Sequence, residues 1–286
     1  MRFLKSGKVK DVYEVEDTEL EFVFSDRISV FDKIIPSKIP HKGETLARTS
    51  ACWFEMCSEL GIPTHYLRLT APNRMRVRRV RVIFDPKQIT HETSNYLIPL
   101  ECIVRYYLYG SLWDRVKRGE LKPSELGFPK GHQASIGEAL PEPFFEVTTK
   151  LEEVDRPLDY PEALKISGLT YDEFTGMKDL ALRIDREMGT RIAPRGLVHV
   201  DGKKEFAFNE KRELMVVDTF GTADEDRFWD EQELKRGRYV ERSKEFVRQY
   251  YRRIGYYDKL VNARASAATE PTIPPLPKDM IEAVSN

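Results

Sequence analysis

Alternating apolar and polar positions predict an antiparallel hairpin near the amino terminus. The two side-chain types largely alternate in KVKDVYEV (8–15), and ELEFVFSD (19–26) shows a similar pattern after a short acidic turn. Successive side chains of a strand point to opposite faces, so this pattern is typical of a strand with one buried face. Further strands are expected over residues 65–70, 75–84 and 100–109, which would make the first third of the chain mainly sheet.

Helical spacing of apolar residues follows the first hairpin. LARTSACWFEMCSEL, between Thr45 and Leu60, ends before a Gly and a Pro, which are helix-stop signals. A second helix is predicted from Thr170 to Gly189, because Thr170 and Glu173 have capping-box spacing. Two more helices are expected, a short one that begins at Ser111 and one over residues 243–255.

Two regions lack such periodicity. Residues 116–168 are rich in Gly, Pro and charge, and they predict long loops around a site. The Pro-rich segment TIPPLPKDM (272–280) predicts an extended strap, because Pro cannot continue a helix.

A second predicted hairpin carries many charges. It consists of GLVHVDGKKEF and ELMVVDTFG, joined by a polar turn. Asp201, Lys203 and Glu205 stand two residues apart and should share one face, and Asp218 on the return strand can come near them. Paired carboxylates with a free face suit Mg²⁺. The alternative is the solvated face of an edge hairpin with cross-strand ion pairs, in which His199 is a strand residue without a catalytic part.

Two short patterns are candidate phosphate-binding sites. Gly7-Lys8-Val9-Lys10 puts two lysines on one face after a flexible glycine, although an exposed basic strand is the alternative. Arg105, in the apolar strand ECIVRYYLYG, precedes Gly110-Ser111 at a strand-to-helix junction, where an anion could be gripped. The alternative for Arg105 and Ser111 is a plain cap with an ion pair to Glu101.

Charge and cysteine content narrow the class of protein. The 46 basic and 47 acidic residues give a net charge of -1, which argues against a nucleic-acid binder held by its overall field. Three cysteines, Cys52, Cys57 and Cys102, lack metal-type spacing and are expected to be reduced core residues of a cytoplasmic protein. The amino-terminal segment lacks the apolar core of a signal peptide, and the sequence contains no apolar run of the roughly 20 residues that a membrane-spanning helix needs. A membrane partner is therefore not expected.

Six segments, taken in order, resemble the SAICAR synthetase (phosphoribosylaminoimidazole-succinocarboxamide synthase) family. They are GKVKDVYEVE, SDRISVFDKIIPSKIPHKGETL, ECIVRYYLYGSLW, TTK, GLVHVDGKKEF and VVDTFGTADEDRFW, and the resemblance runs from about residue 5 to 255. It implies a two-lobe architecture of mixed α+β or α/β type, related to ATP-grasp enzymes and protein kinases. A lobe with an antiparallel sheet and the nucleotide-phosphate loop would span residues 1–99, and a larger α/β lobe with the metal and substrate sites would span residues 100–286.

The resemblance implies an ATP-dependent carbon–nitrogen ligase of purine biosynthesis. Its substrates would be carboxyaminoimidazole ribotide (CAIR) and L-aspartate, its cofactors ATP and Mg²⁺, and its intermediate an acyl phosphate; it leaves a homo-oligomer open. A carboxylate and an amine do not condense in water, so ATP must supply a leaving group, and Mg²⁺ must offset the repulsion between carboxylate and γ-phosphate. No protein nucleophile is needed.

The resemblance also assigns roles to individual residues. Asp201 and Lys203 would be catalytic, with Lys203 stabilising the transferring phosphoryl group. The other implied sets are Gly7, Lys8, Lys10, Leu97 and Glu101 for ATP, the last two in a hinge LIPLE that meets adenine; Glu205 and Asp218 for Mg²⁺; Arg105, Gly110, Ser111 and Arg227 for the ribotide phosphate; and Asp26, Ser29 and Lys42 for the substrate pocket.

The chain departs from the family pattern at several positions. Gly202 stands where the family has Thr or Phe, and Asp226 precedes Arg227 where a small residue, often Ser, is usual. An acid beside a phosphate-binding Arg would weaken its grip if both pointed the same way. Asp155-Arg156-Pro157 replaces an expected His-Asp pair, and DPKQITHET (85–93) is an insertion.

These departures keep other functions open. One is a paralogue that ligates a different carboxylate and amine, and another is a non-catalytic nucleotide-binding module. Asp218-Thr-Phe-Gly221 resembles a kinase metal loop with one residue inserted, but an H-R-D catalytic loop is missing from the sequence.

Overall fold

The computed structural model describes residues 1–152 and 154–285, and its contacts divide the chain into two compact units. The first unit comprises Met1–Phe54, Tyr66–Arg79 and Glu241–Asn286, and the second comprises Glu55–His65 and Val80–Val240. Mixed helices and antiparallel sheets confirm the predicted α+β architecture. The predicted boundary at residue 99 differs from this division, because the carboxy-terminal helices pack with strands of the first unit, which local patterning does not reveal.

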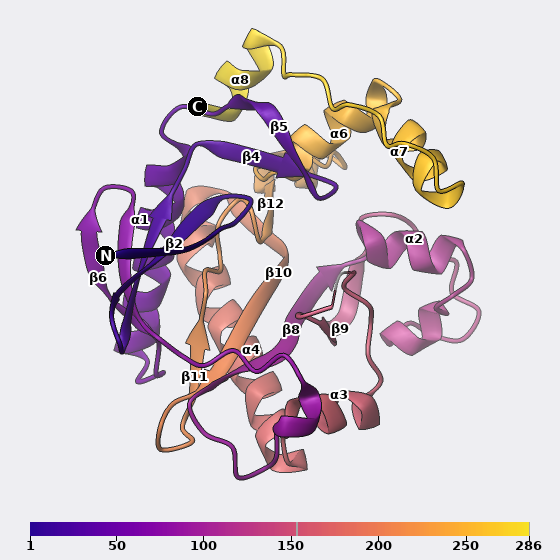
Figure 1. Ribbon diagram of the computed structural model, residues 1–286. Coiled ribbons are helices and arrows are strands. Elements are labelled where there is room, and N and C mark those ends of the chain that lie inside the picture. The colour runs from indigo at the N-terminus through magenta and orange to yellow at the C-terminus, as the bar shows by residue number, and fades with distance from the viewer. Residues whose placement is uncertain (153, 286) are drawn as a thin grey trace. The chain divides into compact units, whose positions relative to one another are not determined.

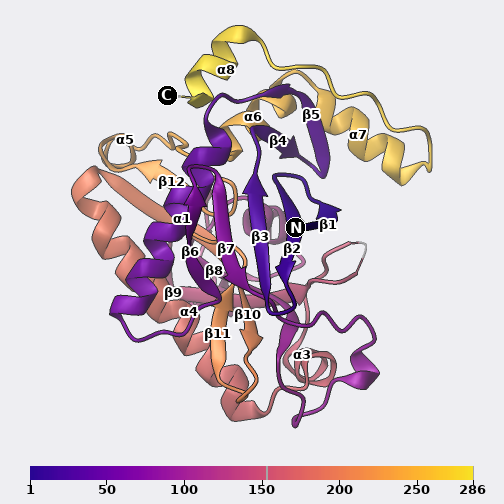
Figure 2. The same ribbon diagram turned by 60° about the vertical axis from the view of Figure 1, so that its left-hand side comes forward.

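The first unit contains a five-stranded sheet in the order β1-β2-β3-β7-β6, seen in Figure 2. The predicted amino-terminal hairpin is confirmed as β2 and β3, which pair antiparallel. Their alternation buries Phe22 and Phe24 on one side, where Met75 and Val77 of β7 are also buried. The strand expected over 75–84 ends early, at Arg78. The bounds are β1 (Arg2–Ser6), β2 (Lys10–Glu16), β3 (Glu19–Phe24), β6 (Tyr66–Ala71) and β7 (Arg74–Arg78).

A second layer of the first unit joins residues far apart in the sequence. Strands β4 (Arg27–Val30) and β5 (Lys33–Lys38) pair with each other, and their apolar side chains share a cluster with α6, α7 and α8 (Figure 1). The strap is extended up to Pro277, and its last three residues begin α8, which the sequence did not predict. The bounds of these three helices are α6 (Glu245–Arg253), α7 (Tyr256–Ala265) and α8 (Lys278–Ser285), and the long helix that precedes β6 is α1 (Lys42–Glu59).

The second unit is built on an antiparallel sheet in the order β11-β10-β8-β9, with β12 also paired to β10. Figure 1 shows β8, β10 and β11 side by side. The charged hairpin is confirmed, but its long strand is interior, because β10 has β8 on one side and β11 and β12 on the other. The bounds are β8 (Tyr96–Tyr107), β9 (Ala139–Thr149), β10 (Leu197–Phe208), β11 (Leu214–Val217) and β12 (Arg227–Asp230).

Helix α4 (Tyr171–Ile192) contacts β8 and β10 and begins at the predicted capping box of Thr170 and Glu173. It buries Met177, Ala181, Ile184 and Met188, the stripe that a 3.6-residue period produces. The helix continues past Gly189, where the sequence predicted its end. Shorter elements of this unit are α2 (Ser111–Lys117), which confirms the helix expected at Ser111, η1 (Pro86–Gln88), η3 (Ala193–Arg195) and α5 (Glu231–Lys235).

The prediction of long loops over 116–168 is wrong. This region holds η2 (Pro123–Leu126), all of β9, and α3 (Tyr160–Ser167). Its prolines occupy positions that regular structure tolerates: both helices carry Pro in their first turn, and β9 is an edge strand that contains two prolines. Among the described residues, no helix is both long and apolar enough to cross a membrane.

Two glycines that end helical segments allow a matched test of packing. Gly168 and Gly196 both have left-handed backbones, with φ of 66° and 70°. A Cβ at Gly168 would lie 2.7 Å from Ile89 Cγ2 and 2.8 Å from the Thr90 carbonyl oxygen, whereas a Cβ at Gly196 would meet nothing within 4 Å.

We expect Gly196→Ala to lower the free energy of unfolding by about 1 kcal/mol, the backbone strain alone. Gly168→Ala should cost roughly 1 to 3 kcal/mol more, because the added methyl group overpacks the site. Urea denaturation of both variants measures the difference, and equal losses would show that the crowding around Gly168 relaxes without cost.

Candidate active site

Strand β10 places charged side chains in the interior of the second unit. Asp201 and Glu205 are only 4% and 3% exposed, and they lie opposite Arg105 and Glu101 of β8 in the register of the two strands. An ionised carboxylate is costly to bury unless it is paired. The alternative of a solvated edge hairpin is therefore wrong, because these charges lie inside the sheet and each has a partner.

One group of charges surrounds Lys203. Its ammonium lies 2.8 Å from Glu101, 3.3 Å from Glu205 and 3.4 Å from Glu225, and Lys150 forms a further ion pair with Glu205. We call these five residues the lysine–glutamate cluster. Its three carboxylates and two ammonium groups leave one excess negative charge, which suits a cation.

Burial shapes the proton affinities of this cluster. Desolvation raises the pKa of Glu101, and the neighbouring Glu205 raises it further in spite of Lys203. Desolvation opposes the charge of Lys203, but Glu225, Glu205 and Glu101 together hold the pKa of Lys203 well above its usual value. Lys203 therefore stays an ammonium group. Lys150 was missed as a functional residue, although it lies in the TTK segment that the sequence already singles out.

Asp218 follows directly after β11, where Val217 pairs with Glu205. Its backbone is left-handed, with φ of 60°, and its carbonyl oxygen lies 3.1 Å from His65 Nε2. Such a conformation in a residue other than Gly costs about 1 kcal/mol or more and is concentrated at functional sites. Of the two residues predicted to hold Mg²⁺, Glu205 thus lies in β10 and Asp218 directly after the neighbouring strand β11.

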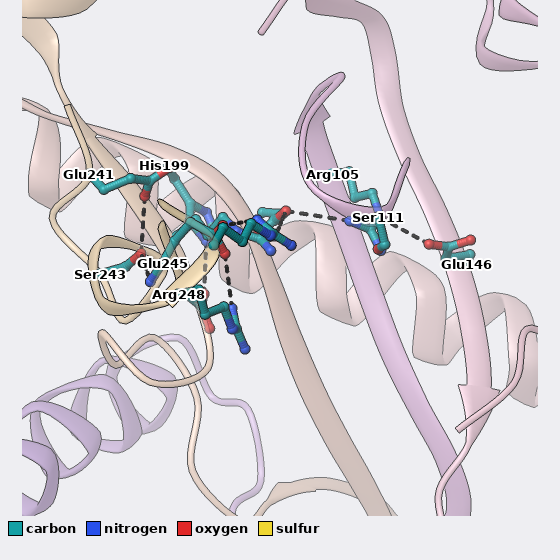
Figure 3. Close-up of polar contacts among 12 residues, drawn as sticks. Arg105, Ser111, Glu146, His199, Glu241, Ser243, Glu245 and Arg248 are labelled. Atoms are coloured by element: carbon teal, nitrogen blue, oxygen red, sulfur yellow. Dashed lines mark hydrogen bonds and ion pairs between the residues drawn. The ribbon is translucent and has the colours of Figure 1, made fainter. Parts of the chain in front are cut away.

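A second group of charges lies four residues away on β10. Arg105 donates to Ser111 Oγ at 3.2 Å and to Glu146 at 2.9 Å, as Figure 3 shows. It also lies 3.5 Å from Asp201, to which Arg227 donates at 2.6 Å. Although burial opposes ionisation, Arg227 and Arg105 lower the pKa of Asp201. Arg115 also pairs with Glu146. We call these five residues, Arg105, Arg115, Glu146, Asp201 and Arg227, the arginine cluster. Its three guanidinium groups and two carboxylates leave one excess positive charge.

Gly110 completes this group. A Cβ there would lie 2.8 Å from Arg227 Nη2, so only glycine lets the backbone approach the guanidinium so closely. Gly110 is the N-cap of α2 and Ser111 its first residue, and no side chain caps the helix. The plain-cap alternative is therefore wrong, and Arg105 pairs with Glu146 rather than Glu101. The structure brings Arg105, Gly110, Ser111 and Arg227 together, as the sequence analysis expected.

The segment predicted as an adenine-binding hinge lies within a strand, at a point where the register with β10 shifts between Leu97 and Glu101. Leu97 and Glu101 lie within β8, which runs unbroken from Tyr96 to Tyr107. Leu97 is buried in an apolar cluster with Ala207, Met215 and Val217. The sequence analysis expected this strand to begin at residue 100, which left the first three residues of the LIPLE segment, 97–99, outside it.

The first unit contains the predicted nucleotide lysines. The Gly7 amide donates to the Lys10 carbonyl oxygen at 2.8 Å, which closes a tight turn between β1 and β2. Lys8, in this turn, forms an ion pair with Asp32, and the Lys10 ammonium lies 4.7 Å from the centre of the Phe22 ring. Two lysines therefore stand at one turn, the arrangement expected of point charges for a polyphosphate.

The predicted pocket residues of the first unit lie around the start of α1. Asp26 accepts a hydrogen bond from the Gly43 amide at 3.0 Å, and Lys42 is the first residue of the helix. Ser29 is buried in β4. The Asp26 carboxylate thus fixes the beginning of α1 to the end of β3.

The other face of β10 holds a buried quartet, Asp185, His199, Lys204 and Asp226. His199 Nε2 lies 2.8 Å from Asp226 Oδ2, His199 Nδ1 lies 3.9 Å from Asp185, and Lys204 pairs with Asp185. Burial lowers the proton affinity of His199, but Asp185 and Asp226 together raise its pKa above the usual value. His199 therefore has carboxylate partners that come from distant segments and that no local pattern reveals.

The Asp155-Arg156-Pro157 segment forms an ion-pair network instead of a His-Asp pair. The Arg156 guanidinium donates to both Glu152 and Glu162, and its amide donates to Thr149 Oγ1 at 3.2 Å. Arg156 thus fastens the segment after Lys150 to α3.

Comparison with known proteins agrees with this arrangement. The family model described as SAICAR synthetase matches residues 3–263. The phosphoribosylaminoimidazole-succinocarboxamide synthase of Thermoplasma volcanium is 52% identical over 286 residues, which cover 100% of this chain and 95% of that protein. The chain belongs to the SAICAR synthetase family.

Solved structures of SAICAR synthetases are similar as well. One in complex with ADP is 25% identical, with a TM-score of 0.68, and the match covers 94% of this chain and 99% of that one. The SAICAR synthase of Saccharomyces cerevisiae in complex with SAICAR has a TM-score of 0.73 at 24% identity, and the match covers 99% of this chain and 90% of that one.

Two departures from the SAICAR synthetase pattern prove to be in contact. The Asp226 carboxylate is turned toward His199 and the Gly221 amide, while the neighbouring Arg227 is turned toward Asp201. A Cβ on Gly202 would lie 2.1 Å from Asp226 Oδ2. The extra acid therefore does not oppose Arg227, and the missing side chain at residue 202 leaves the space that the acid fills.

The raised pKa of His199 predicts a pH-dependent stability. A histidine whose folded pKa lies above its unfolded value of about 6.5 stabilises the fold fully below that pH, and this contribution is lost as pH rises through the folded pKa. We expect His199→Gln to remove this fall in unfolding free energy above pH 6.5, since glutamine does not titrate. Urea denaturation between pH 6 and 9 measures it, with His41→Gln, at an exposed histidine, as control; parallel curves for wild type and His199→Gln would contradict the charged His199.

Proposed function

We propose that this chain catalyses the ATP-dependent condensation of carboxyaminoimidazole ribotide with L-aspartate to SAICAR, ADP and phosphate. The observation that carries the proposal is the family match over residues 3–263, together with a full-length relative at 52% identity. Solved relatives in complex with ADP and with SAICAR agree with it, because both are products of this reaction.

We assign the ribotide phosphate to the arginine cluster. Its three guanidinium groups face two carboxylates, so a phosphate would find an excess positive charge and the Ser111 hydroxyl beside it. Arginine suits this role because its planar fork can donate two parallel hydrogen bonds to phosphate oxygens. Asp201, predicted as catalytic, would act here by holding Arg105 and Arg227 in place.

We assign Mg²⁺ to Glu205 and Asp218. Mg²⁺ is bound in proteins by one or two carboxylates together with phosphate oxygens and water, and the lysine–glutamate cluster offers carboxylates with an excess negative charge. When bound, the ion would reduce the charge repulsion between ATP and the substrate carboxylate.

The remaining roles follow the order of the reaction. A carboxylate oxygen of the ribotide attacks the γ-phosphorus and ADP leaves; the aspartate amine then attacks the carbonyl carbon, loses a proton, and phosphate leaves. Lys203, with Lys150, would hold the transferring phosphoryl group, and Lys8 and Lys10 the other phosphates. The further proposed contacts are Gly7, Leu97 and Glu101 to ATP and Asp26, Ser29, Lys42 and Gly110 to the substrates.

The state of the cysteines bears on the cellular compartment. Cys52 is a free but exposed thiol, so its prediction as a core residue is wrong. Cys57 and Cys102 are buried free thiols, and burial raises the pKa of Cys57 to about 12. Unreactive thiols of this kind support a reducing compartment, and we propose the cytoplasm.

Phosphate release tests the proposed reaction. With ATP and Mg²⁺, we expect sustained release only when both the ribotide and L-aspartate are present, because the acyl phosphate turns over when the amine attacks it. Mass spectrometry should show SAICAR as the product. ATP binding without release from this pair, but with release from another carboxylate and amine, would establish the paralogue instead; binding without any turnover would indicate a nucleotide-binding module.

Glu205→Gln tests the metal assignment. Removing this carboxylate should lower kcat/KM by at least about 100-fold, since the charge of Mg²⁺ acts where negative charge develops. The melting temperature should fall only slightly, because Lys203 keeps Glu101 and Glu225 as partners and Lys150 keeps Glu101 at 3.8 Å, so neither ammonium group is left without a carboxylate. Glu213→Gln, at the exposed turn of the same hairpin, is the control. Retained activity with a large loss of stability would show that Glu205 is a structural residue.

A further inference from the structure

Strand β10 is irregular between His199, which belongs to the buried quartet, and Asp201, which belongs to the arginine cluster. Residues His199 and Asp201 face Phe228 and Arg227 of β12, so Val200 is an extra residue in β10. A bulge of this kind re-aims the side chains that flank it. Beyond it, Asp201 turns to the arginine cluster and Gly202 to the buried quartet.

Asp226 occupies the space above Gly202. The ideal Cβ position of Gly202 lies 2.1 Å from Asp226 Oδ2 and 2.9 Å from His199 Nε2. Gly202 has no left-handed backbone that would require glycine, so space alone excludes a side chain there. The Asp226 carboxylate and a side chain at residue 202 are mutually exclusive.

The Asp226 carboxylate makes two hydrogen bonds with full burial. Its Oδ1 accepts from the Gly221 amide at 3.0 Å, and its Oδ2 pairs with His199 Nε2 at 2.8 Å. Its own amide donates to the Thr222 carbonyl oxygen at 2.9 Å. Asp226 therefore ties the segment that follows Asp218 back to β10, directly before Arg227.

From these contacts we infer that Asp226 and His199 are a positioning pair that sets Arg227 in the ribotide-phosphate site, with Gly202 as the residue that makes room for them. The inference rests on the proposed function of the arginine cluster. Asp226 directly precedes Arg227, the first residue of β12, and the Asp226 carboxylate pairs with His199 while the Arg227 guanidinium pairs with Asp201. Fixing the carboxylate therefore limits the directions that the next side chain can take. His199 is itself held by stacking on Phe228, with ring centres 5.3 Å apart.

The same residues do not suit a metal ion. Ligand atoms of Asp185, His199 and Asp226 lie within 4.8 Å of one another, which is a spacing that metals use. However, the Lys204 ammonium already pairs with Asp185 and is fully buried. With Lys204 and a protonated His199 the two carboxylates are balanced, so a divalent cation would add uncompensated charge.

A double-mutant cycle tests the positioning role. Gly202→Ala should displace the Asp226 carboxylate, and Asp226→Ser should release Gly221 and His199. Each single variant should raise the KM for ribotide about tenfold or more, while the KM for ATP changes less than about twofold. The reason is that a misplaced phosphate ligand affects ribotide binding alone. In the double variant the new methyl group enters the vacated space. Its ribotide KM should be lower than that of either single variant.

Three further variants complete the experiment. Asp226→Asn keeps the acceptor for the Gly221 amide, and its own amide group donates to His199 Nε2 when the ring is neutral and carries its proton on Nδ1, so the ribotide KM should stay within about threefold of wild type. Gly176→Ala, in α4 where a Cβ meets nothing within 4 Å, is the matched glycine control. Ser111→Ala tests the phosphate site separately, because it alters a phosphate ligand without touching Asp226.

The outcomes separate the two hypotheses. Variants of Gly202 and Asp226 that lower the melting temperature but leave the ribotide KM unchanged, while Ser111→Ala raises it, would overturn the positioning role and keep the phosphate site. If Ser111→Ala also leaves the ribotide KM unchanged, the phosphate site is overturned and the positioning role with it. Zinc that stays bound after dialysis of the wild type and is lost in His199→Ala would identify a metal site instead.

Discussion

The second unit depends on the burial of charge on both faces of one interior strand. Asp201 and Glu205 lie on one face of β10 and Lys204, fully buried, on the other. Each charge needs a partner, and each partner comes from a different element: Arg105 from β8, Asp185 from α4, and Lys150 from the segment after β9. Losing one partner of a buried pair costs roughly 3 to 5 kcal/mol, so these pairs fix where the elements lie on β10.

The same pairs separate two sites of opposite charge. Asp201 faces Arg105 and Glu205 faces Glu101 in the register of β8 and β10, so the arginine and lysine–glutamate clusters stand four residues apart on one face. At about 3.3 Å per residue, that is roughly 13 Å. A ribotide whose phosphate lies at the arginines would extend its carboxylate toward the lysine–glutamate cluster, where the proposed phosphoryl transfer occurs. The strand geometry between residues 201 and 205 therefore sets the distance between the two proposed sites.

Local patterns predicted the elements whose signals are local. The hairpins and the Thr170 capping box are examples, because strand alternation and capping need only neighbouring residues. The prediction of long loops over residues 116–168 was wrong because the prolines were taken to interrupt regular structure, whereas they lie in the first turns of helices and in an edge strand. The partners of Lys150 and of His199 lay beyond prediction from local patterns, since these contacts join segments far apart in sequence, although the TTK segment that contains Lys150 had been singled out. The grouping of Arg105 with Arg227 came from the family resemblance rather than from periodicity.

The departures from the family pattern bear unequally on the choice of substrate. On the face of β10 that is turned away from Asp201, the Asp226 carboxylate fills the space that a side chain at residue 202 would occupy. These two departures therefore compensate each other in packing. A different substrate would instead require changes among the side chains proposed to bind the substrates. Of these, Arg105 contacts Ser111 and Asp201, and Arg227 contacts Asp201. Arg156 is held by Glu152 and Glu162 on an exposed segment. The structure therefore favours the reaction of the SAICAR synthetase family over the ligation of a different carboxylate and amine by a paralogue.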